Sequence, residues 1–175
     1  MRIISGKFGS RRLKGTPPSG LRPTSDKLRE TVFNILGVRV EGATFLDGCA
    51  GTGAIGLEAI SRGAALVYFV EQSRKACRMI RENLQELDIQ EGFKVFEMDI
   101  RKAFEIVGAV DIAFVDPPYD RDDLYEATLN HFNGDLLVLE HSKRKDLPEA
   151  AGRLRKIRSL VQGDAALAFY TPEMM

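Results

Sequence analysis

The fold of this chain is decided by the stretch Phe45-Leu46-Asp47-Gly48-Cys49-Ala50-Gly51-Thr52-Gly53-Ala54-Ile55-Gly56. A short apolar run ends at Asp47, a glycine-rich turn follows, and the residues after Gly53 favour a helix. The last six residues match the GxGxxG pattern, in which a strand turns into a helix beside a bound nucleotide. The stretch therefore predicts an α/β fold with a ligand-binding turn at the carboxyl end of a strand.

Apolar runs and helical patterns alternate on both sides of this turn. Ser25 is the predicted N-cap of a helix through about Leu36, and Gly37 can end that helix. Strands are expected at 43–47, 66–71, 93–97, 110–115 and 135–140, and helices at 53–62, 73–88, 100–107 and 121–130. In the tail, two apolar segments flank a Gln-Gly-Asp turn at 162–164 and predict an antiparallel hairpin. We expect a mainly parallel, seven-stranded sheet that is wrapped by helices and completed by this C-terminal hairpin.

A second stretch, Asp116-Pro117-Pro118-Tyr119, follows an apolar run and is expected where open α/β sheets bind their ligands. The prolines fix their own φ and hold the preceding residues extended, so this rigid corner can present the Asp116 carboxylate and the Pro117 carbonyl to one –NH₂ group. Tyr119 can stack on a planar ring. The lone pair of an exocyclic base amine is delocalised into the ring, and two acceptors on its N–H bonds can localise that lone pair toward an electrophile. We therefore interpret the four residues as a catalytic corner. A strand-end turn with a packed tyrosine is the alternative.

The charge at the glycine turn indicates its ligand. Asp47 would repel a pyrophosphate, whereas S-adenosylmethionine (SAM) carries an ammonium and a sulfonium. We expect the turn to hold the methionine end of SAM, Glu71 to accept from the ribose hydroxyls, and Asp99 to meet the adenine amino group. A helix N-cap is an equally strong interpretation of Asp99. The predicted cofactor-binding residues are Asp47, Ala50, Gly51, Thr52, Gly53, Glu71 and Asp99.

These motifs resemble the RsmD family, bacterial methyltransferases that act on the exocyclic N2 of one guanine in 16S ribosomal RNA. The resemblance extends over nearly the whole chain. It is carried by the opening residues 1–7, by 21–26 with Arg29-Glu30, by 33–36, by the block Ala50–Gly63, and by Asp116–Tyr119. One departure is Gly48-Cys49, which stands where such sequences usually carry a larger, often aromatic, pair.

The resemblance implies a SAM-dependent methyltransferase (Rossmann-like) fold and methyl transfer to guanine N2 in 16S ribosomal RNA, within a small-subunit assembly particle. We also expect a monomer. From the residues alone, the corner at 116–119 does not separate guanine from adenine. A DNA adenine-N6 or cytosine-N4 amino methyltransferase is therefore the nearest alternative, although a chain of this length has no room for a target-recognition domain. A protein-glutamine methyltransferase and a nucleotide-binding module without chemistry are weaker alternatives.

Basic residues are concentrated at the N-terminus. Residues 1–29 hold eight Lys and Arg residues against one acid, in a chain whose net charge is zero. Such segregation is typical of a segment that contacts phosphates; a solvated tail and a transit peptide are the alternatives. We predict that residues 1–24 form a β-hairpin, turning near Gly9-Ser10, and an RNA-binding arm, and that 25–175 form the methyltransferase domain. The predicted RNA-binding residues are Arg2, Lys7, Arg11, Arg12, Lys14 and Arg22.

The composition of the chain indicates a globular protein and argues against a membrane span, a disulfide framework and a zinc site. The hydrophobic content of 44% and the charged content of 29% are ordinary for a globular domain. No apolar run approaches the roughly 20 residues of a membrane span, and no signal peptide is recognisable. Cys49 and Cys77 have neither CxxC spacing nor a neighbouring histidine. We therefore expect free thiols in a reducing, cytoplasmic setting, with no metal and no membrane partner.

Overall fold

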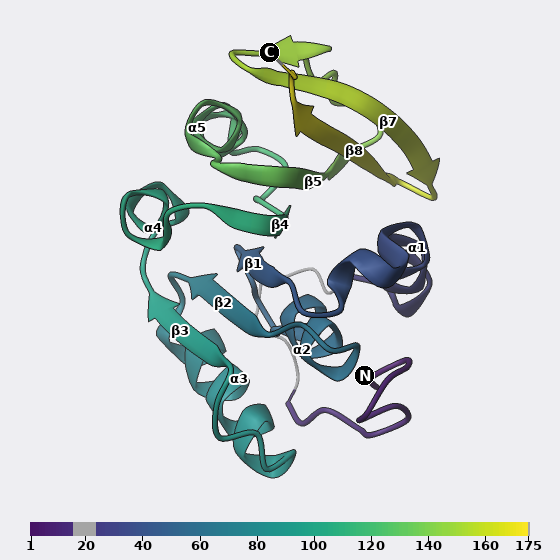
Figure 1. Ribbon diagram of the computed structural model, residues 1–175, viewed down its shortest axis with the longest axis vertical. Coiled ribbons are helices and arrows are strands. Elements are labelled where there is room, and N and C mark those ends of the chain that lie inside the picture. The colour runs from purple at the N-terminus through teal and green to yellow at the C-terminus, as the bar shows by residue number, and fades with distance from the viewer. Residues whose placement is uncertain (16–23, 175) are drawn as a thin grey trace.

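Figure 1 shows the computed structural model, in which residues 1–15 and 24–174 are described. The alternation of helices and strands predicted from the sequence is confirmed. The helices are α1 (Asp26–Leu36), the 3₁₀ helix η1 (Gly37–Val40), α2 (Ala54–Ser61), α3 (Arg74–Glu86), α4 (Ile100–Val107) and α5 (Asp122–His131). The strands are β1 (Thr44–Gly48), β2 (Leu66–Glu71), β3 (Phe93–Glu97), β4 (Val110–Val115), β5 (Gly134–Ser142), β6 (Ala150–Ala151), β7 (Leu154–Gln162) and β8 (Ala165–Pro172).

Local sequence signals set the limits of α1. The Ser25 hydroxyl accepts a hydrogen bond from the Leu28 N–H at 3.1 Å, which confirms the predicted N-cap. At the other end, Gly37 has a φ of 55°, a left-handed value that glycine adopts without steric cost. None of the helices in residues 1–15 and 24–174 is long and apolar enough to cross a membrane.

The strands form one sheet in the order β3-β2-β1-β4-β5-β8-β7-β6. The first five strands pair in parallel, and β8, β7 and β6 are antiparallel. The predicted fold class and its C-terminal hairpin, β7 with β8, are confirmed. Within residues 1–15 and 24–174 the sheet has eight strands where seven were expected, because Ala150–Ala151 pairs with β7. Two residues are too few to display the period-two alternation by which a strand is recognised in sequence.

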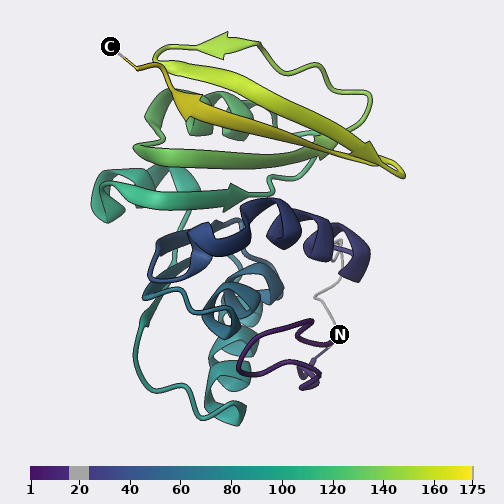
Figure 2. The same ribbon diagram turned by 45° about the vertical axis from the view of Figure 1, so that its right-hand side comes forward.

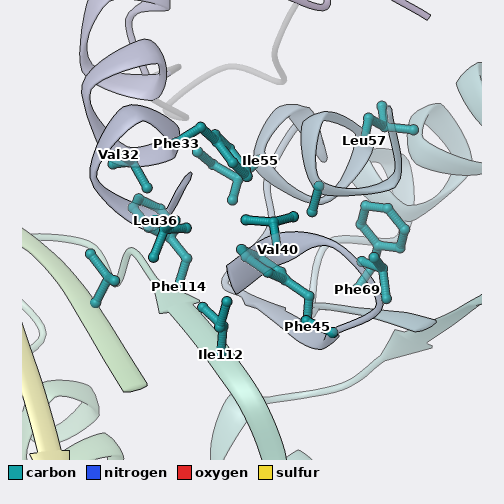
Figure 3. Close-up of a cluster of buried hydrophobic side chains, with 14 of the residues drawn as sticks. Val32, Phe33, Leu36, Val40, Phe45, Ile55, Leu57, Phe69, Ile112 and Phe114 are labelled. Atoms are coloured by element: carbon teal, nitrogen blue, oxygen red, sulfur yellow. The ribbon is translucent and has the colours of Figure 1, made fainter. Parts of the chain in front are cut away.

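Helices cover both faces of the sheet and bury two hydrophobic clusters. Helices α1, α2 and α3 pack on one face, around Phe45, Phe69 and Phe114 (Figure 3). Helices α4 and α5 pack on the other face, around Val115 and Leu139. Successive residues of β4 thus point to opposite faces, as the pleat of a strand requires. Because both faces are covered, the ligand-binding positions lie at the carboxyl edge of the strands.

The N-terminal segment folds as a small hairpin, in which Arg2 and Arg12 form an antiparallel bridge and the Leu13 N–H donates to the Met1 carbonyl at 2.9 Å. Ile3 and Leu13 point inward, with exposed fractions of 1% and 6%, and belong to the same hydrophobic cluster as α1 and α2. Figure 2 shows this segment lying against the helices on that face. The division of the chain at residue 24 stays a prediction, but the described part of the arm packs into the same hydrophobic core as α1 and α2.

Polar contacts from α2 hold the hairpin in place. The carboxylate of Glu58, which is fully buried, accepts from the Ile4 N–H at 3.0 Å, and the Ser61 carbonyl accepts from the Lys7 N–H at 2.8 Å. A Cβ at Gly6 would lie 2.0 Å from the Ser61 carbonyl oxygen, so only glycine permits this close approach. The hairpin is therefore fixed to α2 by backbone hydrogen bonds.

We expect Ile3→Ala to lower the free energy of unfolding by about 2–5 kcal/mol, the usual cost of removing a buried isoleucine side chain. Urea unfolding measures this change, with Ile157→Ala as the matched control. Ile157 is 56% exposed, so its replacement should change stability by only about 0.5 kcal/mol. Equal stability of the Ile3 variant and the wild type would mean that the hairpin does not unfold together with the core.

Candidate active site

A cavity of about 350 Å³ opens at the carboxyl edge of the sheet. It lies where the strand order reverses between β1 and β4, which is the position where open α/β sheets bind ligands. The structure brings most of the predicted site residues into this one cavity, although they come from four separate loops. The predicted residues that line it are Ala50, Gly51, Thr52, Glu71, Asp99, Asp116, Pro117, Pro118 and Tyr119.

The glycine turn owes its shape to left-handed backbone positions. Gly51 and Gly53 have φ values of 55° and 77°, and Gly53 is the N-cap of α2. The third glycine of the motif serves packing instead, because a Cβ at Gly56 would lie 2.3 Å from Cε1 of Phe69. The motif thus turns the chain sharply and lets α2 approach β2 closely.

The pair Gly48-Cys49, which departs from the family pattern, lies at the start of this turn. A Cβ at Gly48 would lie 2.9 Å from Cδ1 of Ile100 and 3.0 Å from Cγ2 of Val115. The neighbouring side chains therefore occupy the space that a larger residue would need. Cys49 lines the cavity and has a φ of 55°. Burial and the acids around it raise the pKa of its thiol well above the usual value, so the thiol stays protonated.

Asp47 is turned away from the cavity, although the sequence predicts it as a cofactor contact. Its carboxylate is 2% exposed and accepts from the Gly56 N–H at 2.8 Å, which ties the first turn of α2 to β1. Burial raises the pKa of this carboxyl well above its usual range. Neither Asp47 nor Gly53 lines the cavity. The contact of Asp47 with SAM stays a prediction, whereas its bond to α2 is observed.

Glu71 lines the cavity and connects two of its walls. One carboxylate oxygen accepts from the Gly51 N–H at 3.0 Å, and the other accepts from the Ser73 N–H at 2.6 Å. These bonds fix the orientation of the carboxylate between the glycine turn and the start of α3. Since a carboxylate has about four acceptor sites, it can still accept from ligand hydroxyls.

Asp99 acts as a helix N-cap and also lines the cavity. Its carboxylate accepts from the Arg101 N–H at 2.8 Å, so the alternative of an N-cap is confirmed. The guanidinium of Arg101 bonds both oxygens of the same carboxylate, at 2.9 and 2.8 Å. The side-chain hydrogen bond from Arg101 lowers the pKa of Asp99 and keeps it anionic. A contact between Asp99 and adenine stays a prediction.

The corner at Asp116–Tyr119 leaves the end of β4. The Asp116 N–H donates to the Gly48 carbonyl at 3.2 Å, which holds the corner beside the glycine turn. The hydroxyl of Tyr125, from α5, lies 3.2 Å from the Pro117 carbonyl oxygen and 2.9 Å from the Glu140 carbonyl oxygen. Burial, together with the negative charge of Asp116, raises the pKa of Tyr125, so this hydroxyl remains a donor. The corner is therefore supported from β1, α5 and β5.

Sequence reasoning missed part of the cavity wall. The unpredicted lining residue that matters most is Glu140, near the end of β5, whose carboxylate accepts from the Thr24 hydroxyl at 3.4 Å. The signal was available, because Glu140 ends the apolar run 136–139 as Glu71 ends that of β2. The other unpredicted lining residues are Thr24, Cys49, Ala54, Ile55, Val70, Gln72, Met98, Ile100, Asp120 and Leu124.

The predicted RNA-binding side chains that the structure describes are not among the residues that line the cavity. Those in the described part of the hairpin are exposed, namely Arg2, Lys7, Arg11, Arg12 and Lys14. Lys14 forms an ion pair with Glu86 at 2.9 Å. Arg22 lies outside the described residues. Whether these cations bind RNA stays a prediction.

The chain is similar to known proteins in both sequence and fold. Residues 1–171 match the family model described as "Conserved hypothetical protein 95". Ribosomal RNA small subunit methyltransferase D of Escherichia coli is 33% identical over 180 residues, which span 99% of this chain and 90% of that protein. The solved structure of yhhF from Escherichia coli superposes with a TM-score of 0.84 at 32% identity, covering 99% of this chain and 98% of that one. The structure of SMU.776, complexed with SAH, has a TM-score of 0.67 at 13% identity, over 85% of this chain and 50% of that one, and shows the shared fold.

Proposed function

The chain belongs to the RsmD family of ribosomal RNA methyltransferases, and from this premise we propose that it transfers a methyl group from SAM to the exocyclic N2 amine of a guanine in 16S ribosomal RNA. One observation carries the proposal. The Asp116–Tyr119 corner and the glycine turn line the same cavity, so an amine acceptor and a nucleoside-bearing donor can meet there. The E. coli relative is named for the small ribosomal subunit, which supports the choice of RNA.

The residues of the cavity fit SAM. The volume of the cavity, about 350 Å³, lies within the range of about 300–1,000 Å³ that small-ligand sites occupy. Glu71 would accept from the ribose hydroxyls, Asp99 from the adenine amine, and the turn Ala50–Gly53 would contact the methionine end. When bound, SAM supplies an electrophilic methyl group.

The corner then orients the amine. The Asp116 carboxylate and the Pro117 carbonyl accept from the two N–H bonds, and Tyr119 stacks on the base. The bond from Tyr125 leaves room for this role, because a carbonyl oxygen has two lone pairs. Catalysis then consists mainly of holding the amine in position among charged and polar groups that are already oriented. The amine nitrogen loses its proton as it becomes cationic. The base must be unpaired or turned out of its helix to reach this cavity.

Transfer of tritiated methyl from SAM tests the proposal. Small-subunit particles, free 16S transcript and duplex DNA are each incubated with enzyme, the particles coming from a strain that lacks this gene. The products are then digested to nucleosides. We expect one N2-methylguanine, with assembly particles labelled better than free transcript, because a compact enzyme must take its specificity from the shape around an accessible base. Finding N6-methyladenine, or equal labelling of DNA, would favour the amino-methyltransferase alternatives.

The arm offers a separate prediction. We expect replacing both Arg11 and Arg12 with alanine to weaken RNA binding. The slope of log K against the logarithm of the salt concentration should fall by about one to two units, because each lost phosphate contact reduces this slope by about 0.7–0.9. Both side chains are exposed, so the fold should be unchanged. The matched control replaces Arg39 and Lys94, which are exposed near the amino ends of β1 and β3. If the two double variants showed equal slopes of RNA affinity against salt concentration, the arm would be a solvated surface that does not contact RNA.

A further inference from the structure

We propose that Glu140 is the residue that selects guanine, by accepting hydrogen bonds from the N1–H edge of the base whose N2 amine is held at Asp116. This inference rests on the proposed function and assigns the specificity of the same site. Glu140 is 4% exposed yet lines the cavity. An acid that is buried and still faces a ligand cavity suits recognition of a polar group by direct contact.

The sheet places Glu140 beside Asp116. In the parallel pairing of β4 with β5, Val115 lies opposite Leu139, and Asp116 and Glu140 are the residues that follow this last pair. Val115 and Leu139 point into the cluster under α4 and α5, and pleating turns the following residues to the other face. Asp116 and Glu140 therefore follow paired positions of neighbouring strands, and both line the cavity.

Hydrogen bonds make the two positions one rigid unit. The Tyr125 hydroxyl lies within 3.2 Å of the Pro117 carbonyl and 2.9 Å of the Glu140 carbonyl, and β8 pairs with β5 from the other side through Leu167. The Thr24 hydroxyl, just before α1, donates to the Glu140 carboxylate at 3.4 Å. Backbone and side chain of Glu140 are thus both held, as a specificity residue requires.

The chemistry of the bases explains the selection. Guanine presents N1–H next to its N2 amine, so two adjacent donors face the corner, and two neighbouring carboxylates are matched acceptors. Adenine presents an unprotonated N1 next to its N6 amine, and cytosine presents N3 next to its N4 amine. Each of these lone pairs would face the Glu140 carboxylate with no proton between them. A buried acceptor left unpaired in this way is costly, and such sites reject the wrong ligand strongly.

The test uses 2-aminopurine, which keeps the 2-amino group but has an unprotonated N1. Once the methylated guanine has been mapped, small-subunit particles are rebuilt with guanine or 2-aminopurine at that position. Single-turnover methyl transfer is then measured at saturating SAM. The wild type should prefer guanine by about a hundredfold or more. Glu140→Gln can donate from its amide to N1, so we expect it to reduce this preference at least tenfold, while SAM affinity stays unchanged.

Two further measurements separate a failure of the role proposed for Glu140 from a failure of the proposed function. Glu126→Gln, an exposed acid on α5, serves as the control and should keep the wild-type preference. The ratio of the wild-type rates on guanine and 2-aminopurine needs no variant, so it tests the inference even if Glu140→Gln folds poorly. Equal rates of the wild type on guanine and 2-aminopurine, or an unchanged preference in folded Glu140→Gln, would overturn the role of Glu140 alone. A wild-type enzyme that methylates no guanine would overturn the proposed function instead.

Discussion

Replacing Asp116 with alanine is expected to lower the rate of methyl transfer by about a hundredfold or more, because a positioned acceptor of this kind contributes about 3 kcal/mol to the transition state. The affinity for SAM should stay within a few-fold of the wild type, since Asp116 faces the acceptor amine. The backbone bond from the Asp116 N–H to Gly48 survives the change, so the corner should keep its position. Single-turnover kinetics and calorimetry with SAM measure the two effects.

Glu126→Ala is the matched control for this experiment, because it removes the same charge from an exposed position on the helix that follows the corner. It should leave both the rate and the affinity unchanged. If SAM affinity fell as steeply as the rate in the Asp116 variant, the residue would belong to the cofactor half of the cavity and the assignment would be wrong.

Glu71→Gln is expected to weaken SAM binding by about tenfold to a hundredfold, which corresponds to one charge-assisted hydrogen bond of about 1.5–3 kcal/mol. Both oxygens of Glu71 accept backbone N–H groups, from Gly51 and Ser73. A glutamine side chain can accept only one of these bonds and turns its –NH₂ toward the other N–H. The variant should therefore loosen the glycine turn as well as lose the contact with the ribose.

Isothermal titration with SAM checks this result, with Glu97→Gln as the control. Glu97 is the register neighbour of Glu71 on β3, but its side chain is exposed, so its loss should not affect SAM. Unchanged affinity in the Glu71 variant would defeat the cofactor arrangement and favour a different ligand. NAD is the ligand to test next, because the GxGxxG turn also fits a dinucleotide.

The sequence by itself determined the elements and the shape of the turns at their ends. Apolar periods, the Ser25 cap and the glycine after Leu36 are signals between residues close in the chain, and they located α1 and the five parallel strands within a few residues. The two quoted stretches also located the glycine turn and the corner at 116–119, which line one cavity in the structure. Each of them encodes its own backbone shape through glycine and proline, so no distant residue is needed to recognise it.

The tertiary structure alone decided which side chains share the cavity. Asp47 looks in sequence like a ligand contact, but a backbone N–H nine residues later takes up its carboxylate. Glu140 ends an apolar run in the sequence, but only the pairing of β4 with β5 shows that it shares the cavity with Asp116. Likewise, the sequence predicts a hairpin in the basic arm, but only the structure shows that it packs on α2, where Glu58 accepts its backbone N–H groups. Strand register and buried hydrogen bonds join residues that lie far apart in the chain, and local patterns carry no record of those partners.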